Sequence, residues 1–394
     1  MKRILKVTSV SALLLSGLIL TACSNTKTSQ NGGSSASNGN VTVELVKGTY
    51  VVPSGESVAN NEKYLALDVK VTNKGDSSLY LSSSDFALYD SNNEKVSDVT
   101  VYDDAGNFKT ISGETLKKGK SVTGYVVYKV EKTSKYELSY APSFTKYDKN
   151  NDDKDVTLPI KASKYEDHTG EVVGLTQEFV NQVFLNNNEA SNAKTVDFHS
   201  SDSKMSLLAS SKSSKSSSSS DKVSLLNNLS NERDNFNNAF ISEFGKLFTH
   251  YSASQSELKT FTDAYEVANA KRAEIQYSIK SYTPDSAIVY IKPNVIDLAS
   301  IDTTNIMQSF INQNKSTYND YNTAYQAAEK YLLEQLPTKL DSTGLATSTY
   351  MDGEGYELQL TKDKDSNKWK VNTEDTSDNY QYKYLEYSFM GNIQ

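Results

Sequence analysis

The chain has 394 residues, 23% charged and 37% hydrophobic, which leaves room for two or three domains that each bury a core. The net charge is −8. The only charged residues among the first 22 are Lys2, Arg3 and Lys6. Without this stretch, the chain carries 38 basic and 49 acidic residues. Such an acidic protein repels phosphate backbones, which argues against nucleic acid as a partner. One cysteine and three histidines exclude disulfides and cysteine-based metal clusters and leave little material for proton-transfer catalysis.

Residues 1–22 have the layout of a secretory signal peptide. A basic start precedes the apolar run 7–20, which is shorter than the about 20 residues of an ordinary membrane-spanning helix. The following Leu-Thr-Ala-Cys sequence, ending at Cys23, resembles the lipobox of bacterial lipoproteins. The resemblance implies cleavage after residue 22 and diacylglycerol transfer to the Cys23 thiol, and a plain signal peptide is the alternative. We expect a lipid anchor on the extracytoplasmic face of the cell membrane.

Residues 23–40 are rich in Ser, Asn, Gly and Thr and predict a flexible tether. Residues 41–163 are dominated by strand signals. Within 62–71, alternate residues from Leu65 to Val71 are apolar, which is the period of a half-buried strand. Further strands are expected at 86–90, 99–102, 122–130, 136–140 and 156–160. Several short strands separated by turn residues predict an all-β sandwich.

Three stretches of this unit carry a family resemblance. They are Val-x-Asn-x-Gly-Asp at 71–76, Phe-x-Leu-x-Asp at 86–90 and Leu-x-x-Gly-x-Ser-x-x-Gly at 116–124. Together they resemble the immunoglobulin-like (telokin-like) domain of Gram-positive lipoproteins, which has no assigned activity. The resemblance implies a sandwich fold and a surface location.

Residues 164–394 change to helical signals. Apolar stripes predict helices over 176–184, 236–248, 256–268 and 311–336, the last ended by Pro337. Alternating residues predict a hairpin of 273–281 with 287–291, and a second of 356–360 with 368–371. Helices followed by hairpins predict an α+β domain with an antiparallel sheet. The final Leu-x-Leu and Trp-Lys-Val strands are similar to the end of NTF2-like lipoprotein domains.

Two further segments of this unit stand apart. Residues 200–221 form a serine tract with scattered lysines, which predicts a disordered insertion. In the C-terminal tail, Tyr380, Tyr382 and Tyr384 alternate with polar residues, which predicts an edge strand or a docking segment. The chain has 26 tyrosines and one tryptophan; tyrosine is common on sheet surfaces and also on surfaces that bind carbohydrate or protein.

Patterns that could carry chemistry are weak. Asp363, Asp365, Asn367 and Glu374 mimic a calcium-loop spacing, but Lys368 occupies the position that needs glycine, so a polar hairpin turn is the preferred interpretation. The acidic run 148–155 is interpreted as a solvated loop rather than a cation site.

The patterns expected for nucleophilic catalysis are equally weak. The Ser-x-x-Lys at 143–146 and the Ser-Asp-Asn at 377–379 match penicillin-recognising enzymes only as short patterns in a serine-rich chain. His168, His199 and His250 are expected to be exposed and without an acidic partner in a triad.

These observations predict a lipid-anchored surface protein that is not an enzyme, needs no cofactor or metal, and binds an unknown protein or cell-wall partner. The alternative is a small-ligand carrier or an enzyme with a pocket in the α+β domain, lined by Tyr277, Tyr290, Leu358 or Trp369 together with a buried acid. A solute-binding protein of an importer is disfavoured, because the two lobes of alternating strands and helices that it needs are absent from the pattern.

Overall fold

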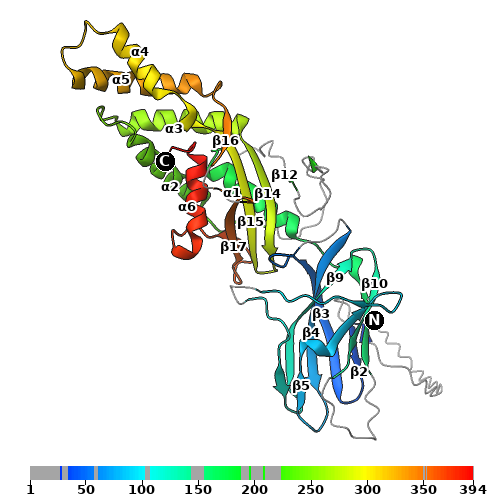
Figure 1. Cartoon of the computed structure of the whole chain (residues 1–394). Helices are drawn as coiled ribbons and strands as arrows, with labels where there is room; N and C mark the ends of the chain where they lie inside the picture. Colours follow the sequence, from blue (N-terminus) through cyan, green and yellow to red (C-terminus); the bar gives the residue numbers. More distant parts are fainter. Residues whose placement is uncertain are drawn as a thin grey trace, which may run out of the picture.

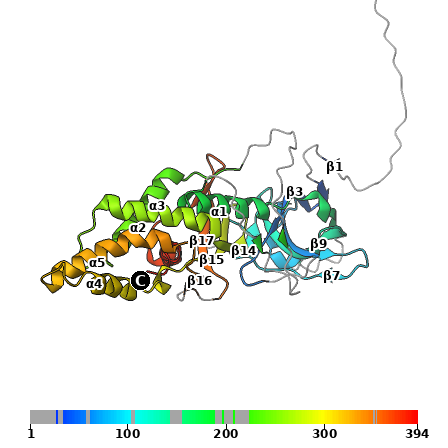
Figure 2. The ribbon, with the colours of Figure 1, turned by 90° about the horizontal axis from the view of Figure 1, so that it is seen from above.

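The computed structural model describes residues 27–28, 34–56, 61–102, 107–142, 155–187, 195–196, 207–208, 223–348, 351 and 353–393. Cys23 lies outside these residues. The described chain forms a long molecule, with an all-β unit at one end and a unit of helices and strands at the other (Figure 1). Seen from above, α4 (Thr303–Gln313) and α5 (Tyr321–Gln335) lie at the end opposite the all-β unit (Figure 2).

The all-β unit consists of two antiparallel sheets around a shared core. The strands of the first sheet are, in spatial order, β1 (Lys27–Thr28), β2 (Ser34–Ser37), β3 (Val41–Val51), β4 (Glu62–Asn73) and β9 (Ser121–Glu131). Those of the second are β11 (Val156–Lys161), β10 (Lys135–Tyr140), β6 (Phe86–Tyr89) and β7 (Lys95–Val96). A separate pair joins β5 (Leu79–Leu81) to β8 (Glu114–Leu116).

Strand β4 shows why this sequence folds as a sandwich. Its alternate residues from Leu65 to Val71 are fully buried and face the second sheet, as the period of two predicts. The opposite face is also covered, because Tyr64 and Ala66 pack in a smaller cluster with Phe108. Strand β4 is therefore buried on both faces, as a central strand between two apolar clusters.

Two predictions for this unit need correction. The segment predicted as a tether, 23–40, contains β2, because Ala36 pairs with Val43 and packs against the core, so the backbone pairing outweighs the poor strand propensity of serine. The strand predicted at 99–102 is not formed. That segment is held to β9 by one backbone hydrogen bond from Val99 to Val127, while Val101 is buried by packing alone.

The two units are joined by direct contacts as well as by the chain. The backbones of Val52 and Tyr282 exchange two hydrogen bonds of 2.9 and 2.8 Å, which links β3 to the second unit. Lys63 on β4 forms an ion pair with Asp167, just before α1 (Thr169–Val183). The ring of Tyr165 packs over Gly48, where a Cβ atom would lie 2.5 Å from a ring carbon. The absence of a side chain at Gly48 thus permits the close approach.

The second unit is built on an antiparallel sheet. Its strands are β14 (Glu274–Tyr282), β15 (Ser286–Ile296), β17 (Tyr356–Lys362) and β18 (Trp369–Val371), with β16 (Leu345–Thr347) paired to β15. Both predicted hairpins are confirmed. Helices α1, α2 (Leu229–Gly245), α3 (Gln255–Arg272) and α6 (Tyr380–Phe389) contribute buried aromatic rings to one core with the sheet.

The predicted helix 311–336 is wrong in extent. Two helices occupy the region: α4 ends at Gln313, and α5 begins after Asp320, whose side chain accepts a hydrogen bond from the Thr323 amide as an N-cap. The predicted end before Pro337 is confirmed, since α5 ends at Gln335. Pro337 itself lies in the first turn of a short 3-10 helix, Leu336–Lys339, where its missing N–H is tolerated.

The prediction of an edge strand in the tail is also wrong. Residues 380–389 form α6, in which Tyr382, Leu385 and Phe389 enter the core. The buried residues Tyr382, Leu385 and Phe389 recur every three to four positions, which is the period of a helix, although the tyrosines alternate. Within 200–221 the structure describes only Leu207–Leu208, which pairs with Thr195–Val196 as a two-stranded sheet, so this part of the predicted insertion is a strand.

Candidate functional site

The pocket predicted in the α+β unit is absent at the residues named for it. Tyr277, Leu358 and Trp369 are buried at 1%, 0% and 3% exposure in the common core, which they help to fill. Tyr290 lies on the opposite face of β15, where Lys280 approaches its ring and pairs with Glu357. A ligand pocket lined by these four side chains is therefore ruled out.

Each of the two described histidines contacts an acidic residue, but neither contact builds the triad that the sequence argues against. His168 Nδ1 lies 3.0 Å from Glu171, because the spacing at the start of α1 places the two side chains together. His250 Nδ1 lies 2.9 Å from Glu329 of α5 and 3.0 Å from the Thr249 hydroxyl. Since both partners meet the same ring nitrogen, this is not the geometry of a catalytic triad. His199 lies outside the described residues.

The other short patterns are structural where they can be described. Asp363 accepts hydrogen bonds from the backbone N–H and hydroxyl of Ser366 within the turn from β17 to β18, and these bonds hold the pKa of that carboxyl below its ordinary value. Within the described ranges, no three His, Cys, Asp or Glu side chains gather as metal ligands. Residues 377–379 form a 3-10 turn, and residues 143–146 and 148–154 lie outside the described part.

A cavity of about 680 Å³ opens where the end of α2 meets the start of α3. Its floor is apolar, made by Ile241 and Leu258, which are nearly buried, and by Gly245. Half-buried Phe248 and Tyr251 contribute aromatic rings. The rim is polar and exposed, and consists of Asn238, Ser242, Thr249, Ser252 and Gln255.

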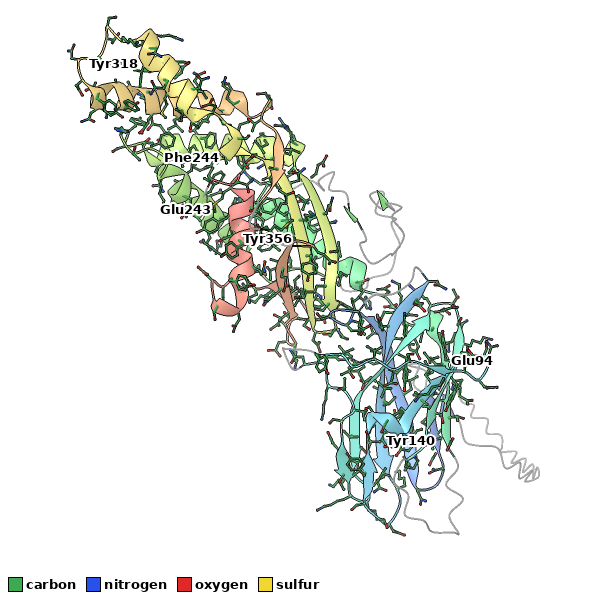
Figure 3. The ribbon with its side chains drawn as sticks, in the orientation of Figure 1. Glu94, Tyr140, Glu243, Phe244, Tyr318 and Tyr356 are labelled. Atoms are coloured by element: carbon green, nitrogen blue, oxygen red, sulfur yellow. The ribbon has the colours of Figure 1, made fainter. Side chains whose placement is uncertain are left out.

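The cavity lies in the helical layer that contains Phe244 and Glu243, far from Tyr140 in the sandwich (Figure 3). Two sequence features create it. Gly245 leaves space opposite Leu258, and the loop 246–254 turns the chain back between two antiparallel helices. A cavity of this size is within the range of small-ligand sites.

The loop 246–254 is held by a buried carboxylate from another helix. Glu329 accepts backbone N–H bonds from Thr249, His250 and Tyr251 at 3.2, 2.8 and 2.7 Å, and also contacts the Thr249 hydroxyl and the His250 ring. Burial raises the pKa of Glu329, but the hydrogen bonds from His250, Tyr251 and Thr249 outweigh burial and leave the pKa below its ordinary 4.5. The carboxylate is therefore charged at neutral pH and fixes the wall of the cavity.

A second carboxylate fixes the other side of the cavity. Ser254 and Glu257 form a capping box at the start of α3, and the Tyr251 hydroxyl donates to Glu257 at 2.6 Å. The hydrogen bonds from Ser254, and then that from Tyr251, lower the pKa of Glu257 to about 2, while the same bond raises the pKa of Tyr251. Tyr251 thus stays neutral and oriented at physiological pH.

Two aromatic rings of α5, exposed Tyr321 and half-buried Tyr325, lie beside His250. Tyr321 and Tyr325 of α5 lie 4.1 Å apart between ring centroids, and His250 lies 5.2 Å from Tyr325. Tyr321 is 62% exposed, although large rings usually gain stability from burial. This aromatic group extends the surface beside the cavity toward α4 and α5.

These residues were not predicted from the sequence. Glu329 follows Ala328 in the apolar stripe of the predicted helix, and an acidic residue beside such a stripe is the one clue to a buried carboxylate. The cavity depends on the pairing of two helices and on a loop held from a third, which no local pattern encodes. Among the described helices, none is both long and apolar enough to cross a membrane.

The chain is similar to known lipoproteins of unestablished function. Residues 31–154 match the family described as a domain of unknown function, DUF4352. The uncharacterised lipoprotein YcdA of Bacillus subtilis (strain 168) is 23% identical over 383 residues, which cover 94% of this chain and 95% of the relative.

Solved structures extend this similarity to the fold. The crystal structure of YcdA aligns with a TM-score of 0.61 and 21% identity over 90% of this chain and 98% of that one. The yjhA protein of the same species aligns over 32% of this chain and 94% of its own, with 25% identity and a TM-score of 0.25. The chain thus shares the overall fold of YcdA along nearly its whole length.

Proposed function

We propose that this chain is a lipid-anchored, extracytoplasmic binding protein without catalytic activity, and that its outer α+β unit carries the binding site. In this proposal residues 1–22 are removed, Cys23 receives the lipid, and an immunoglobulin-like sandwich stands between the membrane and a distantly NTF2-like outer domain. The Leu-Thr-Ala-Cys sequence and the similarity to a lipoprotein over 94% of the chain support the anchor.

The observation that carries the proposal is the cavity between α2 and α3. It combines an apolar floor and two aromatic rings with a largely polar, open rim, so a ligand there would make both apolar contacts and hydrogen bonds. Its wall is fixed from α5 by Glu329, so little ordering would be needed on binding. Helices α2 and α3 lie at the end of the molecule away from the sandwich, which leaves the cavity open to a partner (Figure 1).

The chemistry of the lining favours binding over catalysis. The side chains around the cavity are amides, hydroxyls and apolar groups, and Tyr251 is kept neutral by Glu257. A general acid or base needs a pKa near the working pH and a place beside the substrate. Glu329 and Glu257, the carboxylates that hold the loop 246–254, both have a pKa below its ordinary value and accept hydrogen bonds from several donors.

Surface cross-linking on intact cells tests the proposal. The anchored full-length chain, its Ser242→Trp variant and an Asn231→Trp control would each be cross-linked and recovered. Ser242 lies on the rim of the cavity, whereas Asn231 is exposed on the same helix about 16 Å away. We expect a partner to be captured by the wild type and the control but not by Ser242→Trp. Equal capture by all three, or no capture, would contradict the proposal.

A further inference from the structure

We infer that the cavity between α2 and α3 binds an uncharged, hydroxyl-rich glycan segment. The inference rests on the proposed function, since it names the ligand class of the same site. It follows from three properties of the described residues: the neutral polar rim, the apolar floor with aromatic walls, and the negative charge that already occupies the start of α3.

The rim matches a ligand whose groups both donate and accept hydrogen bonds. Asn238 and Gln255 are amides, and Ser242 and Ser252 are hydroxyl residues; each can donate and accept. Sugar hydroxyls have the same double capacity. All four side chains are exposed, so they are available to a ligand without rearrangement of the fold. A charged group bound here would lose water without meeting an opposite charge.

The interior of the cavity suits the apolar face of a sugar ring. A pyranose presents C–H groups on its faces and hydroxyls around its edge. Phe248 and Tyr251 offer half-buried rings, and Ile241 and Leu258 form the floor. Aromatic side chains that combine a large apolar surface with a polar tip are favoured at such amphipathic sites. The geometry therefore places the apolar contacts inside and the hydrogen bonds at the rim.

An anionic ligand is disfavoured by charge. The start of α3 would attract anions, but Ser254 and the carboxylate of Glu257 already cap it, and Glu257 has a pKa of about 2. Residues 164–394 carry 21 lysines and arginines against 31 aspartates and glutamates, so the unit as a whole repels polyanions. A neutral glycan meets neither barrier.

Binding of defined oligosaccharides to the soluble chain from Ser24 onward tests the inference. The probes are maltotetraose, cellotetraose and tetra-N-acetylchitotetraose as neutral glycans, with tetragalacturonic acid as the charged comparison. Saturation-transfer NMR detects contact, and calorimetry gives the affinity. We expect at least one neutral probe to bind with a Kd of about 1 mM or tighter and the acidic probe to bind at least tenfold more weakly.

Matched variants locate the binding. Replacing Asn238 and Gln255 together by alanine removes two exposed amides, and we expect at least a tenfold loss of affinity. Replacing Asn231 and Gln326 by alanine removes two exposed amides elsewhere, and the affinity should change less than twofold. Fluorescence of the buried Trp369 reports whether each variant is folded.

Three results would overturn the inference: no neutral probe binds at about 10 mM, only the acidic probe binds, or the double variant at the rim binds as well as the wild type. The proposed function can survive such a failure. If Ser242→Trp abolishes capture of a surface partner while no neutral glycan binds, the cavity is a binding site for another class of ligand. If no partner is captured at the cell surface, the proposed function itself fails.

Discussion

Replacing Glu266 by glutamine should change the pH dependence of the stability of the α+β unit. Glu266 lies on α3 and is only 1% exposed. Neither carboxylate oxygen has a hydrogen-bond partner of good geometry, although the amide of Asn186 is close enough to lower the pKa slightly. Burial, and then the charge of Asp263, raise the pKa of Glu266 from 4.5 to about 7, against the opposing charges of Lys259 and Arg233.

The sign and size of the effect follow from this pKa. The folded chain holds the Glu266 proton more tightly than the unfolded chain, so stability falls as the pH rises from about 4.5 to about 7. The whole difference is about 3 kcal/mol, and about 2.5 kcal/mol of it lies between pH 5 and pH 8. Glutamine has nearly the shape of the protonated acid but does not titrate, so Glu266→Gln should remove this loss.

Urea unfolding followed by tryptophan fluorescence measures the effect. Trp369 is the single tryptophan of the chain and is buried in the α+β core, so its signal reports this unit and not the sandwich. Glu266→Gln should stabilise the protein by about 2.5 kcal/mol more at pH 8 than at pH 5. The stability difference between variant and wild type is compared at the two pH values. Effects of the difference in shape between Glu and Gln, and of other titrating groups, are the same in both comparisons and cancel. The same effect at both pH values would refute the assignment of a buried, protonated Glu266.

Three further changes have defined outcomes. Glu329→Gln replaces the carboxylate that accepts these backbone bonds by an amide, and it should lower the free energy of unfolding by about 1–3 kcal/mol. Hydrogen exchange of the Thr249–Tyr251 amides should become faster. In the wild type, the stability that the charged Glu329 contributes is lost as the pH falls below 4.5 through its lowered pKa. Gly48→Ala forces a methyl group against Tyr165 and should cost about 1–3 kcal/mol in urea unfolding, partly recovered by Tyr165→Ala. Cys23→Ser should prevent palmitate labelling and move the protein from the membrane to the soluble fraction; retention in the membrane would contradict the lipid anchor.

The sequence predicts those elements whose pattern is local and strongly periodic. Strand β4 and the hairpin of β14 with β15 follow from alternation, since each places alternate apolar residues in a core, although β4 is also covered on its other face. The tail from Tyr380 to Phe389 was misassigned because alternate tyrosines at 380, 382 and 384 suggested a period of two, whereas Tyr382, Leu385 and Phe389 form the stripe that is buried. Packing of these three side chains in the core favours the helical period over the strand period of two.

The candidate site was harder to foresee than the fold. Its residues come from α2, α3 and the loop between them, and the carboxylate that fixes the loop comes from α5, some 80 residues later in the chain. Such a site depends on which helices pack together. The pocket expected near Trp369 failed for the same reason, since the helices fill that face of the sheet with phenylalanine side chains. Composition indicated only that aromatic and amide side chains were plentiful.

Site-specific photo-cross-linking tests the central claim most directly. A benzophenone amino acid at Ser252 would lie on the rim of the cavity, and the same group at Asn231 would lie on exposed α2 away from it. With the chain anchored on living cells, a binding function at the cavity predicts a cross-linked product from position 252 and none from position 231. No product from 252, or the same product from both positions, would contradict the claim that this cavity is where the protein binds.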